Sequence, residues 1–68
     1  MPYYHVNQNS QSNGDHEVHE NGCGHQPYPE NRFALGFHTS CSGAVREAKK
    51  TYANSNGCYY CCNACHTS

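Results

Sequence analysis

The chain of 68 residues has few of the side chains that build a hydrophobic core. It contains no Trp, no Ile, one Leu, two Phe and three Val. Ordering each residue costs on the order of 1 kcal/mol of conformational entropy or more, which so little apolar content cannot offset. The sequence therefore predicts one small domain, residues 1–68, held together by something other than side-chain burial.

Positive charge and long apolar segments are scarce as well. Only four residues are Lys or Arg and the formal net charge is −1, so the electrostatic footprint of a nucleic-acid-binding protein is missing. No apolar run approaches the roughly 20 residues that span a bilayer. The first residues also lack the basic and apolar regions of a signal peptide. We expect no nucleic-acid partner and no membrane span, and the absence of a catalytic constellation predicts that the protein is not an enzyme.

Two residue types are abundant instead: the chain has six Cys and six His. Cysteine at this density in so short a chain indicates a disulfide framework, a metal site, or both. The sequence therefore predicts a small, mostly irregular fold that is stabilised by a cofactor and by disulfides.

The two halves of the chain differ in composition. Residues 1–32 are rich in Asn, Gln, Ser, Gly and His and show no period of 2 or 3.6, which predicts an extended loop or arm. Residues 33–68 are expected to form the cofactor-binding and disulfide-bonded part. Within that part, residues 33–40 are the most apolar segment and form either a short strand or a surface against a cofactor.

Residues 43–53 are the one segment with a convincing helical pattern. Ser40 or Ser42 can cap its N-terminus, and two lysines near its C-terminal end suit the helix dipole. Its apolar residues share one side of the helix: Ala44, Val45, Ala48 and Tyr52. We also expect a short C-terminal helix within residues 58–66.

That C-terminal segment contains Cys62-Asn63-Ala64-Cys65-His66, which has the spacing C-x-x-C-H. Two thiols three residues apart lie on one face of a helical turn, so both can bond the vinyl groups of one haem. The next residue then directs its imidazole at the iron from the same side. The segment resembles the haem-attachment segments of c-type cytochromes. This resemblance implies one haem c per chain, attached through Cys62 and Cys65, with His66 as an axial ligand.

The second axial ligand is expected to be a histidine, because Met1 is the only methionine. His38, in the apolar segment, and His25, beside Cys23, are the preferred candidates, followed by His16 or His19. A six-coordinate haem predicts electron transfer with redox partner proteins. Poorly covered haem edges further predict a homo-oligomer or filament. Haem attachment and disulfides together predict a periplasmic or extracellular location.

The haem hypothesis leaves four cysteines, which can close two disulfides in one of three pairings: Cys23, Cys41, Cys58 and Cys61. The main alternative is a structural zinc module built from Cys58, Cys61, Cys41 and either His38 or Cys23. A third hypothesis is a secreted peptide with three disulfides. The fourth is an iron–sulfur cluster bound by Cys58, Cys61, Cys62 and Cys65.

The remaining histidine–carboxylate clusters are expected to be solvated loop. They are Asp15-His16-Glu17 and His19-Glu20, and a stray divalent ion is the alternative there. Tyr59 and Tyr60 are expected to pack on a haem edge or on a neighbouring molecule.

Overall fold

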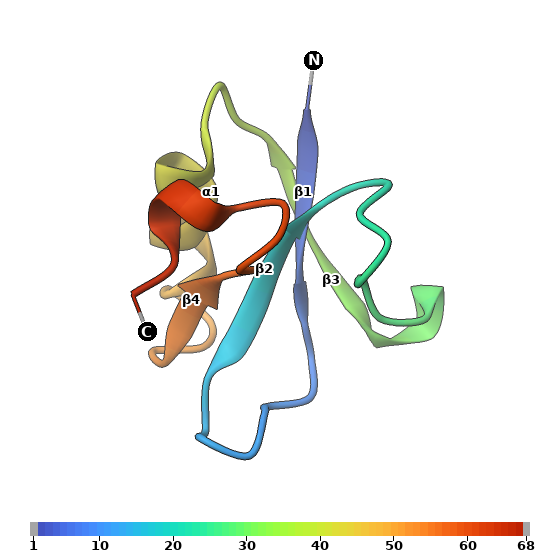
Figure 1. The fold of residues 1–68 in the computed structure, drawn as a ribbon, viewed down its shortest axis with the longest axis vertical. Coiled ribbons are helices and arrows are strands. Elements are labelled where there is room, and N and C mark those ends of the chain that lie inside the picture. Colours follow the sequence, from blue (N-terminus) through green and yellow to red (C-terminus); the bar gives the residue numbers. More distant parts are fainter. Residues whose placement is uncertain (1, 68) are drawn as a thin grey trace.

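Four short strands form a mixed sheet in the computed structural model, which describes residues 2–67 (Figure 1). The strand order is β3–β1–β2–β4, with β1 antiparallel to β2 and β3, and β2 parallel to β4. In chain order the elements, with η for a 3-10 helix, are β1 (Tyr3–Asn7), β2 (His16–Glu20), η1 (Pro29–Asn31), β3 (Arg32–Phe37), α1 (Cys41–Ala48), β4 (Ser55–Gly57) and η2 (Asn63–Cys65). The prediction of a small, largely irregular fold with one α-helix is confirmed.

The prediction of a structureless arm over residues 1–32 is wrong, because β1 and β2 lie at the centre of the sheet. Tyr4, His5 and Val6 are all buried, so both faces of β1 are covered. A strand that is buried on both faces does not show the alternation of apolar and polar residues by which strands are predicted. The connection to β2 contains Asn13 and Gly14, and Gly14 has a φ of 91°. A positive φ favours glycine, and this pair is a turn signal between two strands.

Strand β3 covers most of the segment 33–40, for which a strand was one of the two predictions. The helix α1 begins earlier and ends earlier than the predicted range 43–53. Ser40 occupies the N-cap position in an extended conformation, and α1 ends at Ala48 rather than near residue 53. After Ala48 the backbone tightens: the amides of Lys50 and Thr51 bond to the carbonyls of residues three positions earlier. The predicted C-terminal helix is a single 3-10 turn, η2.

The core is small and contains few large side chains. Val6 of β1 and Val18 of β2 are cross-strand partners, are fully buried, and belong to one cluster with the two buried alanines of α1. The apolar side predicted for the helix therefore faces the sheet. His5 and His19 are also cross-strand partners and buried, and by strand alternation they point to the other face of the sheet.

One disulfide, between Cys41 and Cys65, joins the start of α1 to η2. Its partners differ from the predicted set, in which Cys41 pairs with Cys23, Cys58 or Cys61. Those three thiols are free, as is that of Cys62. No helix among residues 2–67 is both long enough and apolar enough to cross a membrane.

Candidate metal centre

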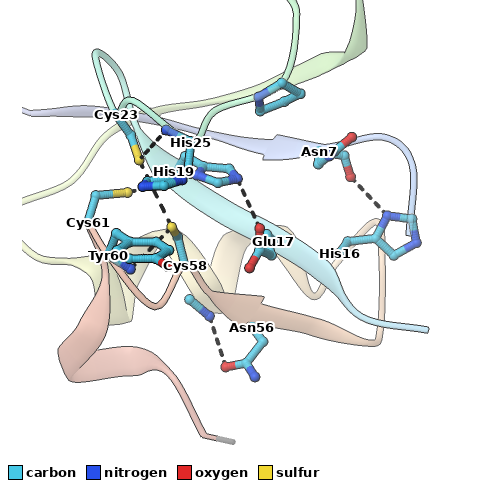
Figure 2. A network of polar contacts seen from close by, with 12 residues as sticks. Asn7, His16, Glu17, His19, Cys23, His25, Asn56, Cys58, Tyr60 and Cys61 are labelled. Atoms are coloured by element: carbon cyan, nitrogen blue, oxygen red, sulfur yellow. Dashed lines mark hydrogen bonds and ion pairs between the residues drawn. The ribbon is translucent and has the colours of Figure 1, made fainter. Parts of the chain in front are cut away.

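Four side chains with metal-ligating atoms gather beside β2: His19, Cys23, Cys58 and Cys61. All four potential ligand atoms lie within 4.8 Å of one another. The Sγ atoms of Cys23 and Cys58 are 4.0 Å apart, and Sγ of Cys61 is 3.9 Å from Nδ1 of His19. Figure 2 shows these side chains pointing toward one another from two separate parts of the chain.

The parallel pairing of β2 with β4 brings the two parts together. Both strands end at the same edge of the sheet, with Val18 opposite Gly57. The amide of Cys58 donates to the carbonyl of Val18 at 2.9 Å, which continues the ladder one residue beyond β4. His19 therefore lies next to the start of the loop that carries Cys58 and Cys61.

Tight turns after β2 and β4 place Cys23 and Cys61, respectively, in the cluster. After β2, Gly22 adopts a φ of 97°, and the amide of Cys23 donates to the carbonyl of Glu20 at 3.0 Å. This turn directs Cys23 back toward His19. After β4, the amide of Cys62 donates to the carbonyl of Cys58 at 2.9 Å, and the resulting turn places Cys61 beside Cys58.

Each of the three sulfurs accepts a backbone N–H. Cys23 Sγ accepts from the amide of His25 at 3.4 Å, and Cys58 Sγ accepts from the amide of Tyr60 at 3.4 Å. Cys61 Sγ accepts from the amide of Glu20 at 3.3 Å. Such donors stabilise a thiolate more than a thiol, because hydrogen bonds to an ionised acceptor are stronger. The same three N–H groups are in place to donate to metal-bound thiolates.

His19 is fully buried, and its ring is oriented by the groups around it. Nδ1 faces Cys61, whereas Nε2 lies 3.5 Å from Oε1 of Glu17 without forming a hydrogen bond. The ring of His5 stacks on that of His19 with a centroid separation of 5.6 Å. The expectation that His19 lies in solvated loop is therefore wrong. Metal binding at Nδ1 leaves the Nε2 proton facing a carboxylate, the usual outer partner of a metal-bound histidine.

Burial perturbs the protonation of these groups when no cation is bound. Burial lowers the pKa of His19 to about 4, and the positive charges of His5, His25 and Arg32 act in the same direction. Burial also raises the pKa of the Cys61 thiol. The histidine is therefore neutral near pH 7 and already suited to bind a metal, whereas Cys61 has to lose a proton when a cation binds.

The spacing of the ligand atoms fits a single tetrahedral ion. Zn²⁺ bonds of about 2.3 Å to sulfur and about 2.0–2.1 Å to nitrogen place two sulfurs about 3.8 Å apart and a sulfur and a nitrogen about 3.6 Å apart in tetrahedral geometry. The observed separations are slightly larger, 4.0 Å between Sγ of Cys23 and Cys58 and 3.9 Å between Sγ of Cys61 and Nδ1 of His19. Three cysteines and one histidine complete the four positions of a structural zinc site. No cavity is found within the described residues.

The residues predicted for a zinc module are only partly those that the structure brings together. Cys58, Cys61 and Cys23 are present in the cluster, whereas Cys41 is bonded to Cys65. His38 lies elsewhere, and its Nε2 is hydrogen-bonded to the carbonyl of Leu35 at 2.9 Å. Sequence reasoning named His19 only as a lesser candidate for haem ligation and left it out of the predicted zinc module.

The three residues of the haem motif have other partners in this structure. Cys65 forms the disulfide, Cys62 is buried at 2% exposure, and Nδ1 of His66 is hydrogen-bonded to the carbonyl of Gly57 at 3.0 Å. A sulfur in a disulfide cannot also form a thioether, so this arrangement does not fit a covalently attached haem. Haem attachment stays a prediction, and it requires the disulfide to be absent.

His25, the other proposed haem ligand, lies at the edge of the metal cluster. Its ring stacks on Tyr60 with a centroid separation of 3.8 Å, and only its backbone amide contacts a ligand sulfur. The iron–sulfur hypothesis shares Cys58 and Cys61 with the observed cluster, but it also needs Cys65 as a free thiol. No protein-family model, curated protein or solved structure matches this chain.

Proposed function

We propose that the protein is a small structural zinc-binding module in which His19, Cys23, Cys58 and Cys61 hold one Zn²⁺. The observation that carries this proposal is the convergence of four ligand atoms within 4.8 Å from segments that are far apart in sequence. The site includes a fully buried imidazole and three sulfurs that each accept a backbone N–H. These four ligand atoms can complete the coordination of one metal ion. Without the ion, buried polar groups of the site lack a bonding partner.

The ligand types favour zinc among divalent cations. Thiolates and imidazoles are the ligands of structural zinc sites, whereas Ca²⁺ and Mg²⁺ take oxygen ligands. Four protein ligands fill every position of a tetrahedral ion, which favours a structural role over a catalytic one.

The sparse core explains why the fold needs a metal. Domains are stable by only about 5–15 kcal/mol, and the chain has few large apolar side chains to reach that value. Zinc binding to a small folded site supplies about 10–16 kcal/mol in zinc-finger peptides at neutral pH. We therefore expect zinc to contribute most of the stability of this fold by fastening β2 and its turn to the segment after β4.

The test is refolding of the purified chain with and without zinc, with its disulfide formed. The zinc-loaded protein is expected to bind one ion per chain and to unfold cooperatively, whereas excess chelator abolishes the folded signal. Substitution of Co²⁺ for zinc is expected to give the intense absorption of thiolate ligation in tetrahedral geometry.

A pair of neighbouring cysteines supplies a matched control for this test. Cys58→Ser removes a ligand and is expected to abolish the cobalt spectrum. Cys62→Ser changes a buried thiol outside the ligand set and is expected to preserve it. A chain that folds equally well in chelator, or binds no zinc, contradicts the proposal.

Electron transfer by a covalently attached haem remains the competing proposal. It rests on the sequence Cys62-Asn63-Ala64-Cys65-His66 and its resemblance to c-type cytochromes. The predicted bis-histidine ligation, filament assembly and extracytoplasmic location belong to this alternative. A mass gain of one haem that persists after denaturation supports it, and a gain of one zinc seen only under native conditions supports the zinc module.

A further inference from the structure

Two of the ligand sulfurs are already close to the geometry of a second disulfide. The Sγ atoms of Cys23 and Cys58 are 4.0 Å apart and buried, although the residues are separated by 35 positions in the sequence. A disulfide needs an S–S distance of about 2.05 Å, so the two sulfurs have to approach by roughly 2 Å. Both lie in turns that follow a strand, where a shift of this size is accommodated more easily than within the sheet.

We infer that the metal centre is redox-sensitive: a two-electron oxidant such as hydrogen peroxide converts Cys23 and Cys58 into a disulfide and releases the metal ion. This inference rests on the proposed zinc site. It assigns to the site a form of regulation in which the bound metal ion and the disulfide between Cys23 and Cys58 exclude each other.

The chemistry proceeds in two steps. Cys23, which is 8% exposed against 1% for Cys58, is the first of the pair to meet the oxidant. Its thiolate attacks one peroxide oxygen, the O–O bond breaks, and a sulfenic acid and hydroxide form. The Cys58 thiolate then attacks the Cys23 sulfur, the S–O bond breaks, and a second hydroxide leaves. Two electrons pass from the sulfurs to the peroxide, and both hydroxides become water by taking protons from the solvent.

Metal release follows from the loss of two ligands. Sulfur in a disulfide is no longer a thiolate and does not hold Zn²⁺, which leaves only His19 and Cys61. The new bond connects the same two segments as the metal, the turn after β2 and the loop after β4. The oxidised chain therefore retains a covalent connection at this position, and a thiol reductant returns the cysteines to the form that binds zinc.

Peptide mapping tests this inference on the zinc-loaded protein. The four basic residues divide the chain for trypsin so that Cys23 lies in peptide 1–32, Cys41 in 33–46 and the last four cysteines in 51–68. Before oxidation, only 33–46 and 51–68 are joined, through Cys41 and Cys65. After hydrogen peroxide, peptide 1–32 is expected to join this pair, with the loss of two hydrogens and the release of one zinc per chain.

Two variants identify the cysteines that react. Cys58→Ser is expected to prevent the new cross-link, whereas Cys62→Ser, which changes a thiol outside the ligand set, retains it. The inference is overturned if peptide 1–32 stays separate while zinc is released, which indicates a bond within residues 58–62, or if the cross-link survives in Cys58→Ser. Retention of zinc by the oxidant-treated protein overturns it as well. Failure of the untreated chain to bind zinc contradicts the proposed zinc site itself, so the two failures are distinguishable.

Discussion

Replacement of His19 by alanine tests whether this buried imidazole binds the metal. Zinc-finger peptides bind Zn²⁺ with about 10–16 kcal/mol, so one of four ligands accounts for about 3 kcal/mol. At 1.4 kcal/mol per tenfold change, His19→Ala is expected to weaken zinc binding by roughly 140-fold. Competition against a chromophoric chelator of known affinity measures this change directly.

His16 supplies the matched control, because it lies in the same strand but outside the cluster. Its ring stacks on Tyr52, and its Nδ1 is hydrogen-bonded to the carbonyl of Asn7. His16→Ala is expected to change zinc affinity by no more than a few-fold. His19→Cys restores a fourth ligand and is expected to bind zinc even if the alanine variant folds poorly. Equal affinities for His19→Ala and His16→Ala would refute the assignment of His19.

Three further predictions concern stability. His19 and the three cysteine thiols have to be deprotonated to hold zinc, so protons compete with the ion as the pH falls. The stability of the zinc-loaded protein is therefore expected to decrease as the pH is lowered from 7, as measured by urea denaturation, and an unchanged denaturation midpoint would contradict this. Cys41→Ser opens a loop with a sequence separation of 24, and is expected to cost about 3 kcal/mol in the same assay at pH 7. Gly57→Ala places a Cβ 2.7 Å from the carbonyl oxygen of Cys62 and 2.9 Å from Cβ of Cys65. This crowding is expected to lower stability by about 1–3 kcal/mol, and an unchanged denaturation midpoint would contradict it.

The composition alone predicted that this fold is not stabilised mainly by a hydrophobic core. The shortage of large apolar residues and the abundance of Cys and His indicated a fold held by a cofactor and disulfides. The helix was also predictable, because Ala44, Val45 and Ala48 repeat with helical spacing and pack on the sheet. Its end was not, because tight i to i+3 bonds replace the helical pattern after Ala48.

The central strands could not be predicted from hydrophobic alternation. In β1 and β2, histidine occupies buried positions next to valine, so a strand covered on both faces resembles a polar loop in sequence. His19 is buried beside three cysteines that lie elsewhere in the sequence, Cys23, Cys58 and Cys61. Single-residue statistics do not contain that coupling.

The ligand set depended on topology more than on local spacing. The pair Cys58 and Cys61 was identifiable, but the partners of this pair follow from the parallel contact of β4 with β2. No local pattern in the sequence indicates which strand lies beside β4. For the same reason, the sequence did not decide whether Cys41 binds a metal or forms a disulfide. In the structure it forms a disulfide with Cys65.

The most direct test of the central claim is a comparison of native and denatured intact masses of the protein as it is produced. The zinc module predicts one zinc per chain in the native spectrum, and in the denatured spectrum the bare chain less the two hydrogens of the disulfide between Cys41 and Cys65. A haem mass that survives denaturation would contradict this account and establish the cytochrome alternative. A metal-free native mass that has lost the hydrogens of three disulfides would contradict both.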